Sequence, residues 1–264
     1  MESLTKADLD KITTEDLSKL LSIDRVFKYT SLSSGINDIL LKSTLKFSDP
    51  TEYNDPFDCH AYLLKVDMSN ANIEAFVDLQ YPNLSRNLKR ELIRRFNTDE
   101  IYKGIESERK RFKITCFSLD KKNTLMWSHY ADKHKGICIG FQFPLIYEDK
   151  FILSPVSYFD KTPLIEGLAD AMKLIRYWLS MKSDCWEYEQ EIRAIRKSKS
   201  ISSFEYIQFE RSCVKEIIFG CKVTQNEIDN SKKLLKLNGF DLKNIFLKKM
   251  VIDKDTFKLK EVLL

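Results

Sequence analysis

The sequence KSDCWEYEQEIRAIR, residues 182–196, carries charged residues at alternate positions. Glu187, Glu189 and Glu191 are followed at the same spacing by Arg193. Side chains of an extended strand point alternately to its two faces, so a strand here would place all four on one face. Neighbouring carboxylates about 6.6 Å apart repel one another unless cations or a ligand compensate. The charged face is therefore either solvated or part of a site.

Strand and helix patterns occur in groups along the rest of the chain. Alternating apolar, β-branched and aromatic residues predict about nine strands. Outside the opening stretch they lie near 25–31, 44–48, 112–118, 137–143, 152–158, 206–210, 214–220, 244–252 and 257–263. Helices are predicted near 33–41, 123–136, 163–181 and 225–237. Because helices and strands do not alternate strictly, the pattern predicts an α+β fold with a mixed or antiparallel sheet.

No linker rich in Pro, Gly or Ser divides the chain, so residues 1–264 are expected to form a single domain. Residues 1–24 are predicted to be an N-terminal helical decoration with one or two short helices. Residues 69–111 are polar, charged and helical in pattern, which predicts a helical insertion or lid. Two basic runs, at 86–96 and 108–113, predict either a solvated helix face or a positive stripe.

The composition argues against several classes of protein. The net charge of +4 is a small difference between 43 basic and 39 acidic residues, so charge alone does not indicate a nucleic-acid partner. Without a signal segment or a run of about 20 apolar residues, we expect cytoplasmic residence and no membrane partner. The six cysteines form no CxxC pair and are expected to be free thiols. The sequence has three histidines and none of the motifs typical of zinc sites, phosphate-binding loops, dinucleotide-binding folds or hydrolases. No metal is therefore expected.

The loop DPTEYNDPFD, residues 49–58, is rich in residues that form turns. Asn54, Asp55 and Phe57 are candidates for contact with a ligand, although turn formation alone explains most of the polar residues. The aromatic side chains of this loop are expected to be buried against the core.

The predicted helix at 123–136 carries Trp127, His129 and Tyr130. Trp127 is expected in the core. His129 and Tyr130 each combine an aromatic ring with a hydrogen-bonding tip, so they fit either a buried polar position or the wall of a pocket.

Four blocks of sequence follow one another between Arg25 and about Gly220. They are FKYTS, LKFSDPTEYNDPFD, CFS followed by LMWSHYADKHKGICIGF, and K-x3-W-x-Y-E-x-E-x-R. In this order they resemble the bacterial domain-of-unknown-function family 2971. That resemblance covers most of the chain and leaves the activity open.

The chain also resembles the ADP-ribosyltransferase-like fold, which places ligand-binding residues on an early strand and a catalytic glutamate at the second acid of a late E-x-E pair. The resemblance implies an ADP-ribosyltransferase-like core. It implies Glu191 as the catalytic residue and Glu189 as the residue that positions or activates the acceptor. The residues that it implies for NAD binding are Arg25, Lys28, Tyr29, Ser118, His129, Tyr130 and Arg193.

The implied activity is that of an NAD-binding transferase or NAD glycohydrolase, with NAD as substrate and protein, nucleic acid or water as acceptor. A bacterial toxin or an anti-phage defence effector would use such an activity.

Two other classes remain open. Asp55, Asp58 and the glutamates could gather a divalent cation for phosphodiester hydrolysis, with the basic runs on nucleic acid. Alternatively, the domain is a non-catalytic interaction module in which Glu189 and Arg193 form an internal ion pair.

Overall fold

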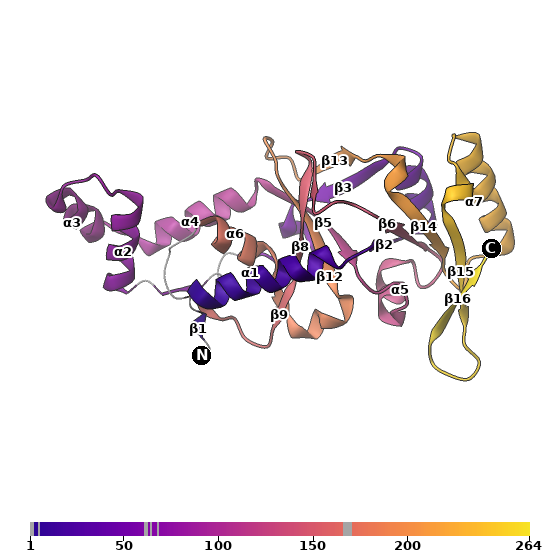
Figure 1. Ribbon diagram of the computed structural model, residues 1–264, viewed down its shortest axis with the longest axis horizontal. Coiled ribbons are helices and arrows are strands. Elements are labelled where there is room, and N and C mark those ends of the chain that lie inside the picture. Colours follow the sequence, from indigo (N-terminus) through magenta and orange to yellow (C-terminus); the bar gives the residue numbers. More distant parts are fainter. Residues whose placement is uncertain (1–2, 5, 61–62, 64, 68, 166–170) are drawn as a thin grey trace.

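The computed structural model describes residues 3–4, 6–60, 63, 65–67, 69–165 and 171–264. A large mixed sheet forms its centre (Figure 1). In the described part of the chain its strands follow the order β16 (Leu259–Leu263), β15 (Phe246–Ile252), β14 (Val214–Phe219), β6 (Ile137–Phe141), β2 (Val26–Thr30), β5 (Phe112–Ser118), β12 (Glu191–Lys197), β8 (Phe151–Pro155) and β7 (Ile146–Tyr147). β13 (Phe204–Gln208) pairs with β3 (Thr44–Ser48), which pairs with one end of β5. β14 and β15 are parallel, whereas their other neighbours pair antiparallel, so the predicted α+β fold with a mixed sheet is confirmed.

Two small parallel sheets accompany the main sheet. The first consists of β1 (Ser3–Leu4), β10 (Leu164–Ile165) and β4 (Lys65–Val66), and the second of β9 (Ser157–Phe159) and β11 (Met181–Ser183). The strand predicted at 152–158 is therefore divided between β8 and β9. The second small sheet is important for the site because it aligns Lys182 with Tyr158 of β9.

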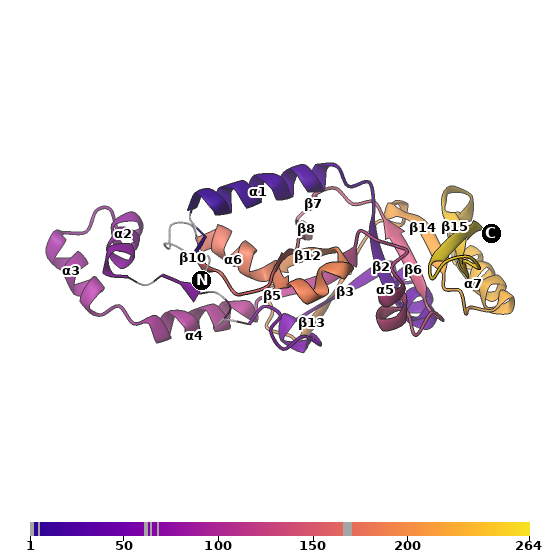
Figure 2. The same ribbon diagram turned by 90° about the horizontal axis from the view of Figure 1, so that it is seen from below.

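The described helices lie around this sheet and beyond one end of it. The α-helices among them are α1 (Lys6–Leu21), α2 (Asn70–Gln80), α3 (Arg86–Arg94), α4 (Thr98–Arg109), α5 (Thr124–Tyr130), α6 (Ala171–Leu179) and α7 (Gln225–Leu237). Figure 2 shows α1 along one long side of the molecule and α7 at the end that carries the C-terminus. The predicted N-terminal decoration contains one helix, and its residues 1–2 and 5 lie outside the described residues. Among the described helices, none has both the length and the apolar character that crossing a membrane requires.

The helices α2, α3 and α4 form an arm that extends away from the main sheet (Figures 1 and 2). The arm has a small apolar centre of its own, in which Ile73 and Val77 of α2 are buried. The ring of Phe76 packs edge to face against that of Phe96, with centroids 6.2 Å apart. The chain returns from α4 directly into β5, a strand of the main sheet.

The side chains of strand β12 point alternately to the two faces of the main sheet. Ile192 and Ala194 point into the largest apolar cluster, where they join Phe117 of the neighbouring strand β5. Glu191 and Arg193 point to the opposite face and are also buried. The charged residues of β12 therefore lie in the interior rather than on a solvated face.

The main sheet opens between β2 and β5. These strands are joined at one residue pair, Phe27 with Ser118. From there β2 continues along β6, while the other end of β5 pairs with β3 at Ile114 and Ser48. Side chains rather than backbone hydrogen bonds must fill the space between β2 and β5.

The continuous strand predicted at 182–196 is wrong. After β11 the chain forms a 3-10 helix at Asp184–Glu189, and β12 begins at Glu191. Between them Gln190 has the left-handed backbone angles φ 44° and ψ 52°, and its N–H donates to the carbonyl of Glu187. A single strand would have gathered three like charges on one face. The helical turn instead leaves Glu187 exposed and turns Glu189 into the interior.

Two predicted helices are shorter than expected. The helix predicted at 123–136 ends at Tyr130, because residues 132–134 have positive φ angles of 45° to 72°, which a right-handed helix cannot contain. The helix predicted at 163–181 contains α6, with β10 near its beginning and β11 at its end. Residues 166–170 of that prediction lie outside the described residues.

Candidate functional site

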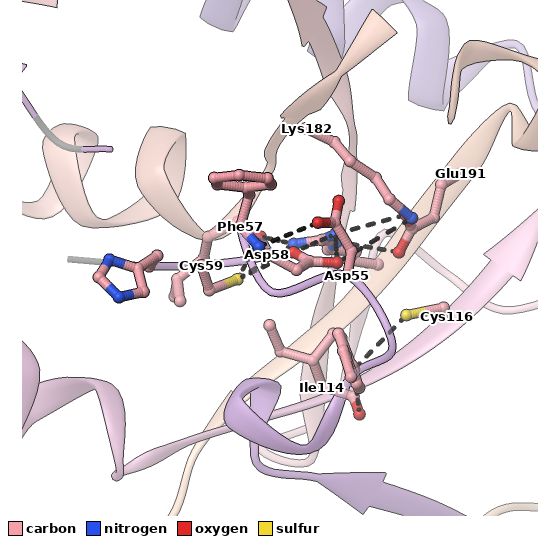
Figure 3. Close-up of polar contacts among 12 residues, drawn as sticks. Asp55, Phe57, Asp58, Cys59, Ile114, Cys116, Lys182 and Glu191 are labelled. Atoms are coloured by element: carbon pink, nitrogen blue, oxygen red, sulfur yellow. Dashed lines mark hydrogen bonds and ion pairs between the residues drawn. The ribbon is translucent and has the colours of Figure 1, made fainter. Parts of the chain in front are cut away.

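Five charged side chains form a buried cluster on the charged face of β12, and Figure 3 labels Asp58, Lys182 and Glu191 among them. They are Asp58, Lys182, Glu189, Glu191 and Arg193, and each is 8% exposed or less. Glu191 and Arg193 belong to β12, Lys182 to β11, and Glu189 to the end of the 3-10 helix. Charged groups are rarely buried to this extent unless they are paired. The pairing within the cluster therefore decides what it can do.

Lys182 connects the two glutamates. Its ammonium group lies 2.5 Å from Glu189 Oε2 and 3.0 Å from Glu191 Oε2 and donates a hydrogen bond to each. Asp58 Oδ2 is 4.0 Å from the same nitrogen. The ring of Trp186 lies against the ammonium group, with its centroid 5.0 Å away. One cation thus offsets the repulsion between carboxylates that the sequence brings close together.

Arg193 is fully buried, and all three of its guanidinium nitrogens have partners. Nε donates to Glu191 Oε1 at 2.9 Å. Nη2 lies 2.7 Å from Asp58 Oδ1 and 2.8 Å from Oδ2. Nη1 donates to the carbonyl of Leu179 at 2.7 Å and contacts Cys59 Sγ at 3.1 Å. Arg193 therefore binds the carboxylates of Glu191 and Asp58. All of its nitrogens already donate to groups of the protein, so none is free to bind a ligand.

The charges within the cluster set the protonation of its members. Burial acts to raise the pKa of Glu191, but the positive charges of Arg193 and Lys182 outweigh it and lower this pKa to about 2. Burial acts to lower the pKa of Lys182, but Glu191, Glu189 and Asp58 raise it. Burial raises the pKa of Asp58. At neutral pH Glu191 is therefore an ionised carboxylate and Lys182 a cation.

A cavity of about 180 Å³ opens beside this cluster, where the sheet opens between β2 and β5. It is lined by Phe27, Lys28, Tyr29, Tyr53, Asn54, Asp58, Cys116, Phe117, Ser118, Met126, Tyr130, Lys182, Glu189 and Glu191. One wall is charged and most of the remainder is aromatic. Such a cavity suits a flat ring whose other end carries hydrogen-bonding groups or positive charge.

A second cavity of about 420 Å³ adjoins the first. The two share the lining residues Lys28, Tyr29, Tyr53, Cys116 and Tyr130. Lys28 bridges the opening in the sheet, because its ammonium group donates to Thr115 Oγ1 and to the carbonyl of Cys116, both at 2.9 Å. Burial lowers the pKa of Lys28. Lys28 thus stands between the two cavities.

Helix α5 positions Tyr130 over the cluster. The hydroxyl of Tyr130 donates to Glu189 Oε1 at 2.6 Å, and burial together with this hydrogen bond raises the pKa of Tyr130. At the start of the helix, Asn123 accepts from the N–H of Leu125 and donates to the carbonyl of Tyr188 at 2.9 Å. Both ends of α5 are therefore tied to the turn that carries Glu189.

Several residues predicted to bind NAD come together at the first cavity. They are Lys28, Tyr29, Ser118 and Tyr130, along with the predicted catalytic residues Glu189 and Glu191. Two of the hydroxyls also fasten the surrounding backbone. Ser118 Oγ donates to the carbonyl of Glu189 at 2.6 Å, and the hydroxyl of Tyr29 donates to the carbonyl of Asp120 at 2.6 Å.

Three other residues predicted to bind NAD do not line this cavity. Arg25 lies 3.1 Å from Asp24 and 3.5 Å from the buried carboxylate of Glu216, which draws it away from the site. His129 is exposed on α5. Arg193 is fully buried and pairs with Glu191 and Asp58.

The loop at 49–58 contributes fewer side chains than its composition indicates. Asn54 lines the first cavity. Asp55 is buried and accepts from the N–H of Phe57 at 2.9 Å, which is turn formation. Phe57 is 64% exposed, so its predicted burial is wrong. Tyr53 lines the cavity and donates to the carbonyl of Ile114 at 3.0 Å.

Sequence reasoning missed two members of the site. Lys182 begins the block K-x3-W-x-Y-E-x-E-x-R, but its role depends on the pairing of β11 with β9, which no local pattern indicates. Cys59 contacts Arg193 across 134 residues of chain. Within the described residues, no group of three or more His, Cys, Asp or Glu side chains is arranged to hold a metal ion.

Comparison with known proteins gives one result. No curated protein and no solved structure matches the chain. Residues 126–194 match the family described as Protein of unknown function (DUF2971). This segment contains most of α5, all of β6 and four of the five charged residues of the cluster. The resemblance to family 2971 is therefore confirmed for the part of the chain that carries most of the cluster. Over residues 126–194 the chain is therefore similar to the DUF2971 family.

Proposed function

We propose that the protein cleaves the bond between nicotinamide and ribose in NAD and transfers ADP-ribose to a protein, a nucleic acid or water. One observation carries the proposal. Two buried carboxylates, Glu189 and Glu191, lie side by side on the wall of a cavity whose other walls are largely aromatic. The resemblance to the ADP-ribosyltransferase-like fold assigns the same two residues to this chemistry.

Cleavage of this bond develops positive charge on the ribose ring. A fixed carboxylate stabilises such a charge without having to move or reorganise. Glu191 suits this role because its pKa of about 2 keeps it ionised throughout the neutral range. Lys182 and Arg193 keep it ionised and hold its orientation through hydrogen bonds at 3.0 and 2.9 Å.

Glu189 suits the second role, that of orienting the acceptor or the ribose hydroxyl groups. Each of its carboxylate oxygens accepts one hydrogen bond, Oε1 from Tyr130 and Oε2 from Lys182. A carboxylate oxygen has two acceptor positions, so each retains capacity for a hydroxyl of the substrate.

The two cavities support a ligand with two unlike halves. The first is smaller than the roughly 300–1,000 Å³ of typical ligand sites, while the two together fall within that range. In our proposal the nicotinamide ring occupies the aromatic first cavity, against Tyr29 and Tyr130. The rest of the dinucleotide then extends past Lys28 into the second cavity.

The proposal includes action in the cytoplasm as a bacterial toxin or anti-phage defence effector. The free cysteines favour a reducing compartment, because two are fully buried thiols and none of the six forms a disulfide within the described residues. The acceptor is a protein, a nucleic acid or water.

The test combines NAD binding by titration calorimetry with chromatographic detection of released nicotinamide. We expect Glu191→Gln to lower the rate of nicotinamide release by about 10²–10³-fold while NAD still binds. Glu189→Gln should lower transfer to an acceptor more than hydrolysis. Glu187→Gln is the matched control, since Glu187 belongs to the same motif but is exposed.

Circular dichroism of each variant shows whether the fold is intact. The proposal fails if the wild-type protein neither binds nor consumes NAD, or if Glu187→Gln and Glu191→Gln have equal effects. Absence of NAD binding would support the non-catalytic module. Magnesium-dependent cleavage of nucleic acid that is lost in Asp58→Asn would support the nuclease.

A further inference from the structure

Helix α3 forms the far end of the arm and has no buried residue. Figures 1 and 2 both show it away from the main sheet. The pair of Lys89 and Asp78, at 2.7 Å, fastens α3 to α2. Surface helices normally bury an apolar stripe on the protein, yet α3 leaves Leu88 54% exposed and Leu92 38% exposed. The helix is therefore held outward by few contacts and presents most of its surface to solvent.

Three arginines form a stripe along the outward surface of α3. Arg86, Arg90 and Arg94 recur every four residues, so they share one face at intervals of about 6 Å. Arg86 and Arg90 are exposed, and within the described part of the chain neither forms an ion pair or a hydrogen bond. The side chain of Arg94 is 82% exposed and lies 3.5 Å from Glu91. Most of the positive charge of this stripe is thus not neutralised by the protein.

We propose that the stripe of Arg86, Arg90 and Arg94 binds the phosphate backbone of a nucleic acid. Guanidinium groups bind phosphate oxygens in a bidentate manner, and three of them along one face of a helix can each bind a phosphate of the same nucleic-acid backbone. The contacts involve the backbone, so the stripe binds without preference for sequence. Nucleic acid fits this surface by charge complementarity, even though the chain as a whole carries only +4.

An anionic membrane surface fits the helix less well. A helix that lies in a membrane surface buries its apolar side chains and keeps its basic residues at the same level or just above. On α3 the exposed leucines point away from the arginines, since Leu88 is about 200° around the helix from Arg86. Burying the leucines would turn the stripe away from lipid phosphates. With nine residues, α3 is also short for such a helix.

This inference is independent of the proposed cleavage of NAD. It uses no residue of the cavities or of the charged cluster, and its test contains no NAD. Failure of one proposal therefore leaves the other untouched.

The test measures binding of the full chain to fluorescein-labelled 20-mers, one single-stranded DNA, one duplex DNA and one RNA, by fluorescence anisotropy at several salt concentrations. We expect the variant Arg86→Gln, Arg90→Gln, Arg94→Gln to bind at least about tenfold more weakly than wild type at low salt. The slope of log affinity against log salt should become shallower by about two to three. Circular dichroism confirms that the helices remain.

The matched control is Lys232→Gln, Lys233→Gln, Lys236→Gln, which removes the same charge from α7. This control should bind as wild type does. The proposal is overturned if the arginine variant binds like wild type, if the α7 control loses as much affinity, or if no oligonucleotide binds at low salt. It is also overturned if phosphatidylserine vesicles bind through the arginines while the oligonucleotides do not.

Discussion

Glu189 and Glu191 accept hydrogen bonds from one ammonium group, that of Lys182, at 2.5 and 3.0 Å, although Glu189 ends a 3-10 helix and Glu191 begins a strand. The left-handed backbone of Gln190 makes this possible. In a regular strand the two carboxylates would project in parallel, about 6.6 Å apart. The turn lets both approach one cation.

The conformation of Gln190 gives the first prediction. Its φ of 44° and ψ of 52° cost side-chain residues about 1–2 kcal/mol, most of all β-branched ones. Gln190→Gly should change the free energy of unfolding by less than about 1 kcal/mol, because the relief of strain offsets the added entropy of the unfolded chain. Gln190→Val should lower it by more than 1 kcal/mol. Urea denaturation measures both, and equal effects would contradict the role of the turn.

The second prediction concerns acid stability. The pKa of Glu191 is lowered from 4.5 to about 2, so this residue contributes stability that is fully present above pH 4.5 and lost as the pH falls through 2. The contribution is on the order of 3 kcal/mol. In Glu191→Gln, the decline of unfolding free energy between pH 4.5 and 2 should be smaller by about that amount. The unfolding free energy of Glu187→Gln should decline in parallel with that of wild type. If that of Glu191→Gln also declines in parallel, the lowered pKa of Glu191 is wrong.

The third prediction concerns Arg193. Lysine in its place keeps the charge but cannot supply donors to Glu191, Asp58 and the backbone at once. Breaking a buried network of this kind costs about 3–5 kcal/mol, so Arg193→Lys should lower the free energy of unfolding by about 3 kcal/mol. Arg196→Lys on the same strand is the control, because the side chain of Arg196 is 22% exposed, and it should cost under about 1 kcal/mol. Similar losses in both variants would argue against the network.

Local periodicity predicted the strands of the main sheet well. In β12 the apolar residues Ile192 and Ala194 alternate with Glu191 and Arg193, and the structure keeps that alternation. The same periodicity failed at Glu187 and Glu189, because alternation of charge also fits a tight helical turn. Charge spacing alone does not distinguish the two, since the deciding feature is the backbone conformation of one residue, Gln190.

The sequence predicted the site residues that lie within a motif. It did not predict the contacts that depend on pairing between distant parts of the chain. Tyr130, Glu189 and Glu191 lie in the blocks of sequence that resemble the family, and they meet at one cavity. The contact of Arg193 with Asp58 joins residues 135 positions apart. Such a pairing follows from how the loop packs against β12, which is set by the whole core rather than by any local pattern.

The last prediction separates the hydroxyl of Tyr130 from its ring. Tyr130→Phe leaves one oxygen of the buried Glu189 without its donor at 2.6 Å, and hydrogen bonds to charged groups contribute about 1.5–3 kcal/mol. The free energy of unfolding should fall by that amount in urea denaturation. Tyr188→Phe is the control, because in the described part of the chain its hydroxyl has no hydrogen-bond partner, and it should change stability by less than about 0.5 kcal/mol. If both variants are as stable as wild type, Tyr130 does not hold Glu189, and the acceptor-side role proposed for Glu189 loses its structural basis.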